Sequence, residues 1–428
     1  MAGDPTTAQV RAAARATYAV FIAAGFAFAT WASRIPTVRD HLGLNPDQLG
    51  LVLLSIAAGS VVSLPITGWL IHRVGTRAAV AGTAALLCVG LVVVGIGYFV
   101  GVALVVVGLF LQGFGNGAWD VAMNVQGAAV ERRIGRAIMP RFHAGFSFGT
   151  VVGALVGASM EALHVPVVVH FGAAAVVAVT TVFVAVRHFL ADDHEADHEA
   201  DPDRTDTDRT DTDRATEATS FRAAGVFTRW REPRTVLIGF FVLAFAFAEG
   251  TGNDWISIGL IDGYHVRTAV GTLGYATFLA AMTMARWTGP ALLDRFGRVA
   301  VVRVLAAVAV AGLLLFVFGR ATPVAYVGAL LWGTGVSLCF PVGMSAAADE
   351  PRAAAARVSV VASIGYCAFL GGPPLIGFLA ARAGVLHAFV AVAVLVTVAA
   401  GLAGSLRPPG PVDGQDARTR RRVANLPG

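Results

Sequence analysis

Long hydrophobic runs, separated by short polar loops, recur along almost the whole chain. A run of about 20 apolar residues can cross a bilayer as an α-helix, which satisfies its own backbone hydrogen bonds there. The pattern therefore predicts an all-α membrane protein with twelve transmembrane helices in two pseudo-symmetric six-helix bundles. The expected helices are 16–34, 47–71, 78–98, 102–125, 139–161, 166–188, 234–258, 270–293, 299–319, 323–347, 357–381 and 385–406.

One polar stretch is much longer than the others and separates six runs from six. Between Ala191 and Arg214 it holds eleven acidic residues and three arginines, a net charge of −8, whereas the whole chain is +5. Such a segment has too little apolar surface to fold. We expect an N-terminal bundle over 1–188, a disordered acidic linker over 189–233, a C-terminal bundle over 234–406 and a basic tail over 407–428.

The composition excludes soluble globular classes, because 56% of the residues are hydrophobic, 14% are charged and the mean hydropathy is +0.70. Cys88, Cys339 and Cys367 stand alone in separate apolar runs, which supports neither a disulfide framework nor a zinc site. We expect no cofactor, no bound metal, no catalytic residue and no nucleic-acid partner. Membrane lipids surround the chain, which we expect to be a monomer.

The arginines indicate the orientation in the membrane. Loops on one side carry only Arg34, Arg39, Arg267, Arg320 and Arg382, whereas nearly all other arginines fall on the side of the two termini. Because cytoplasmic loops carry an excess of positive charge, we expect a multi-pass cell-membrane protein with both termini in the cytoplasm.

Polar residues interrupt the fourth predicted helix at a regular spacing. Gln112, Asn116, Asp120 and Asn124 are four residues apart, which places them in a slowly drifting stripe on one helix face. A carboxylate inside the bilayer is costly unless it faces the protein interior or a wet cavity. We interpret the stripe as part of a substrate or proton pathway. The alternative is a buried polar network that only joins helices.

The seventh predicted helix carries two more acids. Glu249 lies just past its middle and shares a face with Asn253, whereas Asp254 lies nearer the far end and is turned away from Glu249. Trp255 is either a stacking surface or an interfacial anchor. Asp254, Glu249 and Asp120 are expected at successive depths in the bilayer, which suits one path through it.

Three basic groups complete the set of intramembrane charges. His143 opens the fifth helix near the mouth on the side of the termini. Arg286 lies in the eighth helix, where it either belongs to the pathway or extends toward the headgroups. Arg34, at the far end of the first helix, is interpreted as a headgroup or gate residue.

The two halves of the chain repeat each other. Phe26-Ala27-Phe28-Ala29 in the first helix recurs as Phe245-Ala246-Phe247-Ala248 in the seventh. Gly68-Trp69-Leu70-Ile71-His72-Arg73-Val74-Gly75-Thr76-Arg77 after the second helix recurs as Leu293-Asp294-Arg295-Phe296-Gly297-Arg298 after the eighth. Both comparisons give a spacing close to 220 residues. Parallel six-helix repeats are a transporter architecture with a binding site between the halves.

Over essentially its whole length the sequence resembles the major facilitator superfamily, because the signature loop G-x-L-a-D-R-x-G-R-R is recognisable twice. His72 stands where the family usually has an aspartate. The resemblance implies that these loops support gating; the glycine allows a tight turn, and the arginines hold helix C-termini and carboxylates. The implied gating residues are Gly68, Arg73, Gly75, Arg77, Asp294, Arg295, Gly297 and Arg298.

A finer resemblance is to a bacterial branch related to the fucose:proton symporters. It rests on Gly117-Ala118-Trp119-Asp120-Val121-Ala122-Met123-Asn124, on Arg141-Phe142-His143-Ala144 and on Ala248-Glu249-Gly250 with Asn253-Asp254-Trp255. An antiporter-type motif in the fifth helix is incomplete, since Thr150 replaces its proline. Its small residues predict a close helix contact instead: Gly145, Gly149, Gly153 and Gly157.

These observations predict a secondary active transporter, driven by protons, for a small solute. A sugar-like solute is the first hypothesis, because the side-chain amides can bind hydroxyls while Trp119 and Trp255 can stack on a ring. Export of amphipathic compounds is the alternative. Two other classes are a receptor or scaffold and a metalloprotease, since His194-Glu195-Ala196-Asp197-His198 matches H-E-x-x-H within the low-complexity linker.

Overall fold

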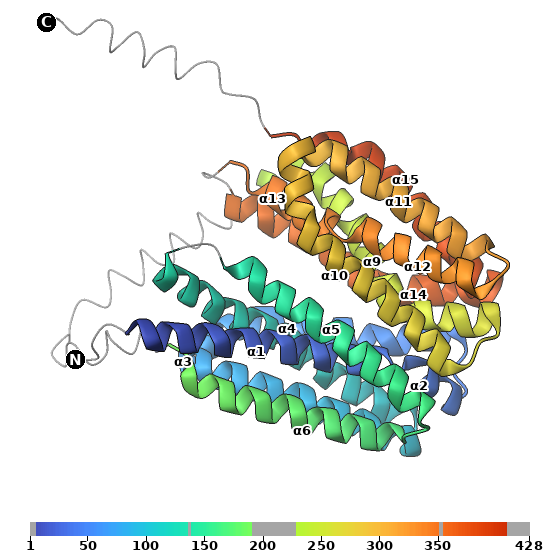
Figure 1. Ribbon diagram of the computed structural model, residues 1–428, viewed down its shortest axis with the longest axis horizontal. Helices are drawn as coiled ribbons and strands as arrows, with labels where there is room; N and C mark the ends of the chain where they lie inside the picture. Colours follow the sequence, from blue (N-terminus) through green and yellow to red (C-terminus); the bar gives the residue numbers. More distant parts are fainter. Residues whose placement is uncertain (1–5, 136–137, 191–227, 351–353, 409–428) are drawn as a thin grey trace, which may run out of the picture.

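The computed structural model describes residues 6–135, 138–190, 228–350 and 354–408, and these residues form an all-helical protein. One group of helices comprises α1 (Thr7–Ala32), α2 (Ile35–His41), α3 (Pro46–Val100), α4 (Val102–Ile134), α5 (Met139–Ala162), α6 (Val167–Ala185) and η1 (Val186–His188). The other comprises α9 (Pro233–Tyr264), α10 (Thr268–Phe296), α11 (Arg298–Phe318), α12 (Thr322–Val336), α13 (Cys339–Ala347), α14 (Ala354–Ala383), α15 (Val385–Leu402) and η3 (Ala403–Leu406). The two groups lie side by side as separate bundles (Figure 1). The predicted fold class is confirmed, whereas most of the expected linker and tail lies outside the described residues.

Two glycines make the same turn at equivalent places in the two bundles. Gly75 has φ 78° and ψ 161° and divides the 55-residue α3 into the second and third predicted helices. Gly297 has φ 76° and ψ 158° and separates α10 from α11. Only glycine adopts this conformation readily. Eleven described helices are long and apolar enough to cross a membrane, and the break in α3 brings the crossings to the predicted twelve.

Two helix ends differ from their predicted positions because of capping residues. α1 begins at Thr7 rather than at 16, because Thr6 and Gln9 form a reciprocal capping box. α4 continues to Ile134 rather than ending at 125. Gly135, at φ 72°, then ends the helix.

The tenth predicted helix, 323–347, is not continuous. α12 ends at Val336, and α13 begins at Cys339 after a break at Ser337 and Leu338. The break frees a backbone carbonyl at Ser337, and Arg286 donates to it from Nε at 3.0 Å. A hydrophobicity pattern does not reveal such a break, because both sides remain apolar.

The glycine row of α5 packs directly against α1, as predicted. A Cβ added at Gly149 would meet the backbone carbonyl of Ile22, and one at Gly153 would meet that of Phe26. Tyr18 and Ser33 lie in the same way against the two ends of the row, at Gly145 and Gly157. The row is therefore a helix contact rather than a ligand site.

The bundles face each other through two helix pairs, α3 with α14 and α5 with α10. We call the face where α1 begins and η3 ends the terminal face, and the opposite one the distal face. The hydrogen bonds and ion pairs that join the bundles between described residues all lie near the distal face. Arg39 on α2 binds both carboxylate oxygens of Asp262 on α9, at 2.6 Å and 2.9 Å.

Large side chains near the terminal face are left uncovered. The exposed fraction is 61% for Trp69, 57% for Trp287 and 56% for Phe296. Among the described residues, side-chain bonds therefore join the bundles near the distal face and not near the terminal face. Figure 1 shows the same arrangement, with the bundles apart on the side of the N-terminus.

Candidate functional site

The centre of the second bundle holds an ion pair between α9 and α10. Arg286 Nη2 donates to both carboxylate oxygens of Glu249, at 2.9 Å and 3.0 Å. The exposed fractions of the two side chains are 28% and 20%, so the pair is half-buried. Arg286 also binds the carbonyl at Ser337, as described above. The guanidinium of Arg286 is directed to Glu249 rather than to the headgroups, and its role in a pathway stays a prediction.

The carboxylate of Asp120 is exposed in the middle of α4. Asn124 Nδ2 donates to its Oδ1 at 3.2 Å and to its backbone carbonyl at 2.8 Å. Within the described chain, Asp120 has no cationic partner and no hydrogen bond to Asn116. Asp120 lies within electrostatic range of Tyr366 on α14 of the second bundle.

The predicted stripe on α4 does not stay on one face. Each step of four residues turns the direction by about 40°, because a helical turn takes 3.6 residues. Gln112 is 2% exposed and its Oε1 has no partner in the described protein, whereas Asp120 is exposed. Only the part of the stripe near Asp120 therefore reaches the space between the bundles.

The glycines between these polar residues serve helix packing. A Cβ at Gly113 would meet the carbonyl of Ile56, and one at Gly115 would meet the backbone of Leu87. Both contacts are with α3. These glycines therefore bring helices together and do not provide space for a ligand.

His143 is exposed at the start of α5 and stacks edge-on against Phe21, with ring centroids 5.2 Å apart. It lies within electrostatic range of Arg286 on the other bundle. The facing surfaces of the bundles thus carry His143 and Asp120 on one side and the pair of Glu249 and Arg286 on the other.

A second polar group lies deeper in the second bundle. Asn253 Oδ1 and the Tyr275 hydroxyl are buried without a hydrogen-bond partner among the described atoms. Tyr275, on α10, is within electrostatic range of Asp254 and Glu249. The structure thus places the predicted Asp254 near Tyr275, which the sequence analysis did not select.

The predicted role of the tryptophans is wrong. Trp119 is 1% exposed and Trp255 is 0% exposed, and the indole nitrogen of neither has a partner among the described residues. Neither ring offers a free face to a solute, and Trp255 is not an interfacial anchor. Both are large core side chains, because their helix faces point into the bundles.

Arg34 is not a headgroup residue, because it is only 1% exposed. It forms an ion pair with Glu161 at 2.6 Å and donates from Nε to His170 Nδ1 at 3.1 Å. Glu161 also accepts from Thr37. Arg34 precedes α2 and Thr37 lies on it, so the cluster joins the start of α2 to α5 and α6 inside the first bundle near the distal face. Its only signal in the sequence was one polar residue near the end of each of these helices.

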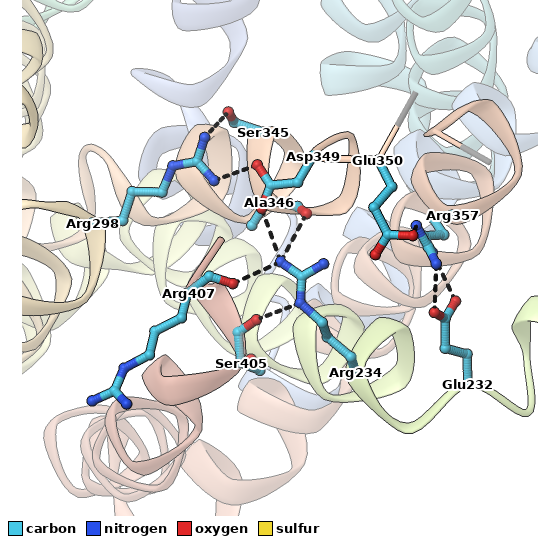
Figure 2. A network of polar contacts seen from close by, with 10 residues as sticks. All are labelled: Glu232, Arg234, Arg298, Ser345, Ala346, Asp349, Glu350, Arg357, Ser405 and Arg407. Atoms are coloured by element: carbon cyan, nitrogen blue, oxygen red, sulfur yellow. Dashed lines mark hydrogen bonds and ion pairs between the residues drawn. The ribbon is translucent and has the colours of Figure 1, made fainter. Parts of the chain in front are cut away.

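The signature loops bind within their own bundles. Arg77 Nη2 donates to the carbonyl of Phe189 at 3.0 Å, after the end of η1. Arg298 binds Asp349 at 2.6 Å, and Arg234 binds the other oxygen of Asp349 at 2.9 Å. Figure 2 shows this network at the terminal face. Both implied arginine roles, holding a helix end and holding a carboxylate, are therefore present.

The remaining loop residues do not bridge the bundles either. Arg73 lies over the ring of Trp69 at 5.6 Å, and Arg295 lies over Phe296 at 5.1 Å. Asp294 is exposed and forms no ion pair with any described residue. A contact network between the two loops is thus absent from the described part of this conformation.

The comparisons with known proteins agree with this architecture. Residues 17–370 match the family model described as Major Facilitator Superfamily. The chain is 32% identical over 397 residues to the uncharacterized transporter y4wD of Sinorhizobium fredii, covering 92% of this chain and 98% of that protein.

Two solved structures share the fold at 13% sequence identity. A mutant of the nucleoside transporter NupG superposes with a TM-score of 0.71 and covers 91% of this chain and 99% of that one. A bacterial homologue of the human lysosomal transporter Spinster, solved inward-facing and unoccupied, gives a TM-score of 0.70 with 94% and 98% covered. The chain belongs to the Major Facilitator Superfamily, and this membership supports secondary transport of a small solute across a membrane.

Proposed function

We propose that the chain is a proton-coupled secondary transporter of a small polar, sugar-like solute, which binds between the bundles and crosses by alternating access. The observation that carries this proposal is the half-buried pair of Glu249 and Arg286, whose arginine lies within electrostatic range of His143 on the other bundle. Ionisable groups at this depth are costly and are retained where they serve a pathway.

The ion pair supplies the coupling step. While Glu249 is ionised, its carboxylate holds the Arg286 guanidinium. A proton on Glu249 removes the charge attraction and leaves Arg286 free to donate to a hydroxyl of the solute. Binding of the solute and binding of the proton then depend on each other, because each changes the partner of Arg286.

The direction of the opening follows from the arginine distribution. That distribution assigns the terminal face to the cytoplasm. With this orientation, the distal contacts, including the Arg39 and Asp262 pair, close the outer side, which supports an inward-facing state. We also propose that the chain belongs to the bacterial branch related to the fucose:proton symporters.

The test uses purified full-length protein in proteoliposomes that contain a pH-sensitive dye. Monosaccharides, polyols and amphipathic cations are added with and without an imposed proton gradient. We expect one or more polar solutes to accumulate when the outside is acidic, with proton entry that follows the solute. Movement of amphipathic cations alone would replace this proposal with export, and no movement of any solute would favour a receptor or scaffold.

The metalloprotease hypothesis is tested separately. Its motif, from His194 to His198, lies outside the described residues. Deleting 192–214 should leave transport intact, since the proposed pathway is formed by the two bundles.

A further inference from the structure

A groove of about 750 Å³ lies between α1 and α6, on a side of the first bundle that takes no part in its contacts with the second. Its walls are small or apolar. They comprise Ala12, Ala16 and Ala19 on α1, and Val176, Val177, Thr180, Thr181, Val184 and Ala185 on α6. Small side chains let a hydrocarbon chain approach the two helix backbones closely.

The length of the groove matches one leaflet. On α6 and η1 its lining runs from Val176 to His188, which is about 18 Å at 1.5 Å per residue. The hydrocarbon of one leaflet is about 15 Å deep, half of the bilayer core. The groove is therefore long enough to hold an acyl chain of the leaflet at the terminal face.

Basic side chains gather at the end of the groove near the terminal face. Arg15 and His188 belong to the lining, Arg11 lies one turn before Arg15, and Arg187 precedes His188. All four side chains are exposed. None of the three arginines forms an ion pair with another described residue, and neither α1 nor α6 contains an acid.

We propose that the groove between α1 and α6 binds one anionic phospholipid of the leaflet at the terminal face. An acyl chain lies between the alanines of α1 and the valines of α6, and the phosphate binds Arg15. A guanidinium matches phosphate geometry through two parallel hydrogen bonds. The net negative charge of the lipid is selected because Arg11 and Arg187 add to the local positive potential.

The site can be tested in nanodiscs without any transport assay, so its outcome is independent of the proposed function. The full chain is placed in nanodiscs with a trace of phospholipid that carries a photoreactive acyl chain, with either a phosphatidylglycerol or a phosphatidylcholine headgroup. After illumination, labelled peptides are mapped by mass spectrometry. We expect labelling of both groove helices, several-fold stronger with phosphatidylglycerol.

Two variants separate the headgroup from the acyl chain. Arg15→Gln should lower phosphatidylglycerol labelling of the groove about fivefold, from the loss of one basic contact. Thr180→Phe fills the groove from its exposed wall and should lower labelling with both lipids. The matched controls are Arg303→Gln, an exposed arginine at the same membrane face on α11, and Val304→Phe, an exposed position beside it.

Equal labelling by both lipids, unchanged in Arg15→Gln, would overturn the proposal and make the groove ordinary lipid-facing surface. Cross-links from the groove helices to a second copy would also overturn it, in favour of a dimer contact. The thermal melting of each variant shows that the fold is retained, which we expect because Arg15 and Thr180 are exposed.

Discussion

Glu249 and Arg286 come from different helices, yet Arg286 Nη2 lies within 2.9 Å and 3.0 Å of the two carboxylate oxygens of Glu249. The same arginine holds the carbonyl freed by the break between α12 and α13. A change in the charge of Glu249 therefore affects Arg286 on α10 and, through Arg286, the break between α12 and α13.

Glu249→Gln should uncouple solute movement from the proton gradient. The amide keeps the shape and part of the hydrogen bonding but cannot release a proton. We expect accumulation against a gradient to be lost while solute counterflow, which needs no net proton movement, stays within a few-fold of wild type. Uptake and counterflow are measured in the same proteoliposomes.

The matched control is Glu232→Gln, which alters another glutamate–arginine pair, at the terminal face and away from the centre. It should leave coupling unchanged. Accumulation by Glu249→Gln equal to that of wild type would show that Glu249 is not the coupling group.

The pair of Arg39 and Asp262 should hold the distal side closed. Asp262 is 37% exposed, so solvent screening limits the pair to about 1 kcal/mol, a fivefold shift between conformations. Asp262→Asn should raise the population closed at the terminal face. The measurement is the distance distribution between spin labels at Ile66→Cys and Leu292→Cys, with the native cysteines replaced.

Arg382→Gln is the control for this shift, because Arg382 and Asp47 lie 3.7 Å apart and are 56% and 44% exposed. It should change the distances much less than Asp262→Asn does. An unchanged distribution in Asp262→Asn would mean that backbone packing, such as Gly50 against Pro373, closes the distal side by itself.

The sequence allowed the helices, the repeat and the glycine contacts to be predicted, because each depends on local composition or spacing. Gly75 and Gly297 are recognisable since the turn excludes other residues. The partners in the ion pairs were harder to predict from the sequence. Glu249 and Arg286 are 37 residues apart, and Arg34 and Glu161 are 127 apart, so their contacts depend on which helices are neighbours. Trp119 was misassigned because aromatic rings suit both a core and a solute site.

The Glu232 and Arg357 pair should make stability depend on pH in the acid range. Two hydrogen bonds from Arg357, at 2.6 Å and 2.8 Å, hold the pKa of the Glu232 carboxyl below its usual 4.5. Because the pKa of Glu232 is lower in the folded than in the unfolded protein, ionised Glu232 stabilises the fold fully above pH 4.5. This stabilisation is lost as the pH falls through the folded-state pKa. Thermal melting of wild type should exceed that of Glu232→Gln at pH 6 and converge with it near pH 3. A constant difference across that range would contradict the linkage.

Gly149→Ala should destabilise the first bundle. The added methyl group would meet the carbonyl of Ile22, and neither backbone can yield without separating α1 from α5. Overpacking of this kind costs about 1–3 kcal/mol. Gly82→Ala is the control, since nothing lies within 4 Å of a Cβ added at this position and alanine favours a helix. Melting temperatures in detergent should fall for Gly149→Ala and stay or rise for Gly82→Ala.

Asp120 should be required for transport but not for folding. Its carboxylate is exposed and accepts one side-chain hydrogen bond, from Asn124, which also binds the backbone carbonyl of Asp120. Asp120→Asn keeps an oxygen that accepts from Asn124, whereas Asp120→Leu removes that one hydrogen bond, worth about 1 kcal/mol, and Asn124 keeps the backbone carbonyl as a partner. We expect both variants to insert and melt close to wild type.

Transport should respond differently from stability. Asn at position 120 keeps the polarity and the size of the side chain, but it carries no charge and takes up no proton at neutral pH. If Asp120 binds the solute or the proton between the bundles, Asp120→Asn should lose most uptake, and Asp120→Leu should also lose solute counterflow. Wild-type uptake by Asp120→Asn, measured beside Asp47→Asn as a control at an aspartate that is 44% exposed near the distal face, would restrict the pathway to Glu249, Arg286 and their neighbours in the second bundle.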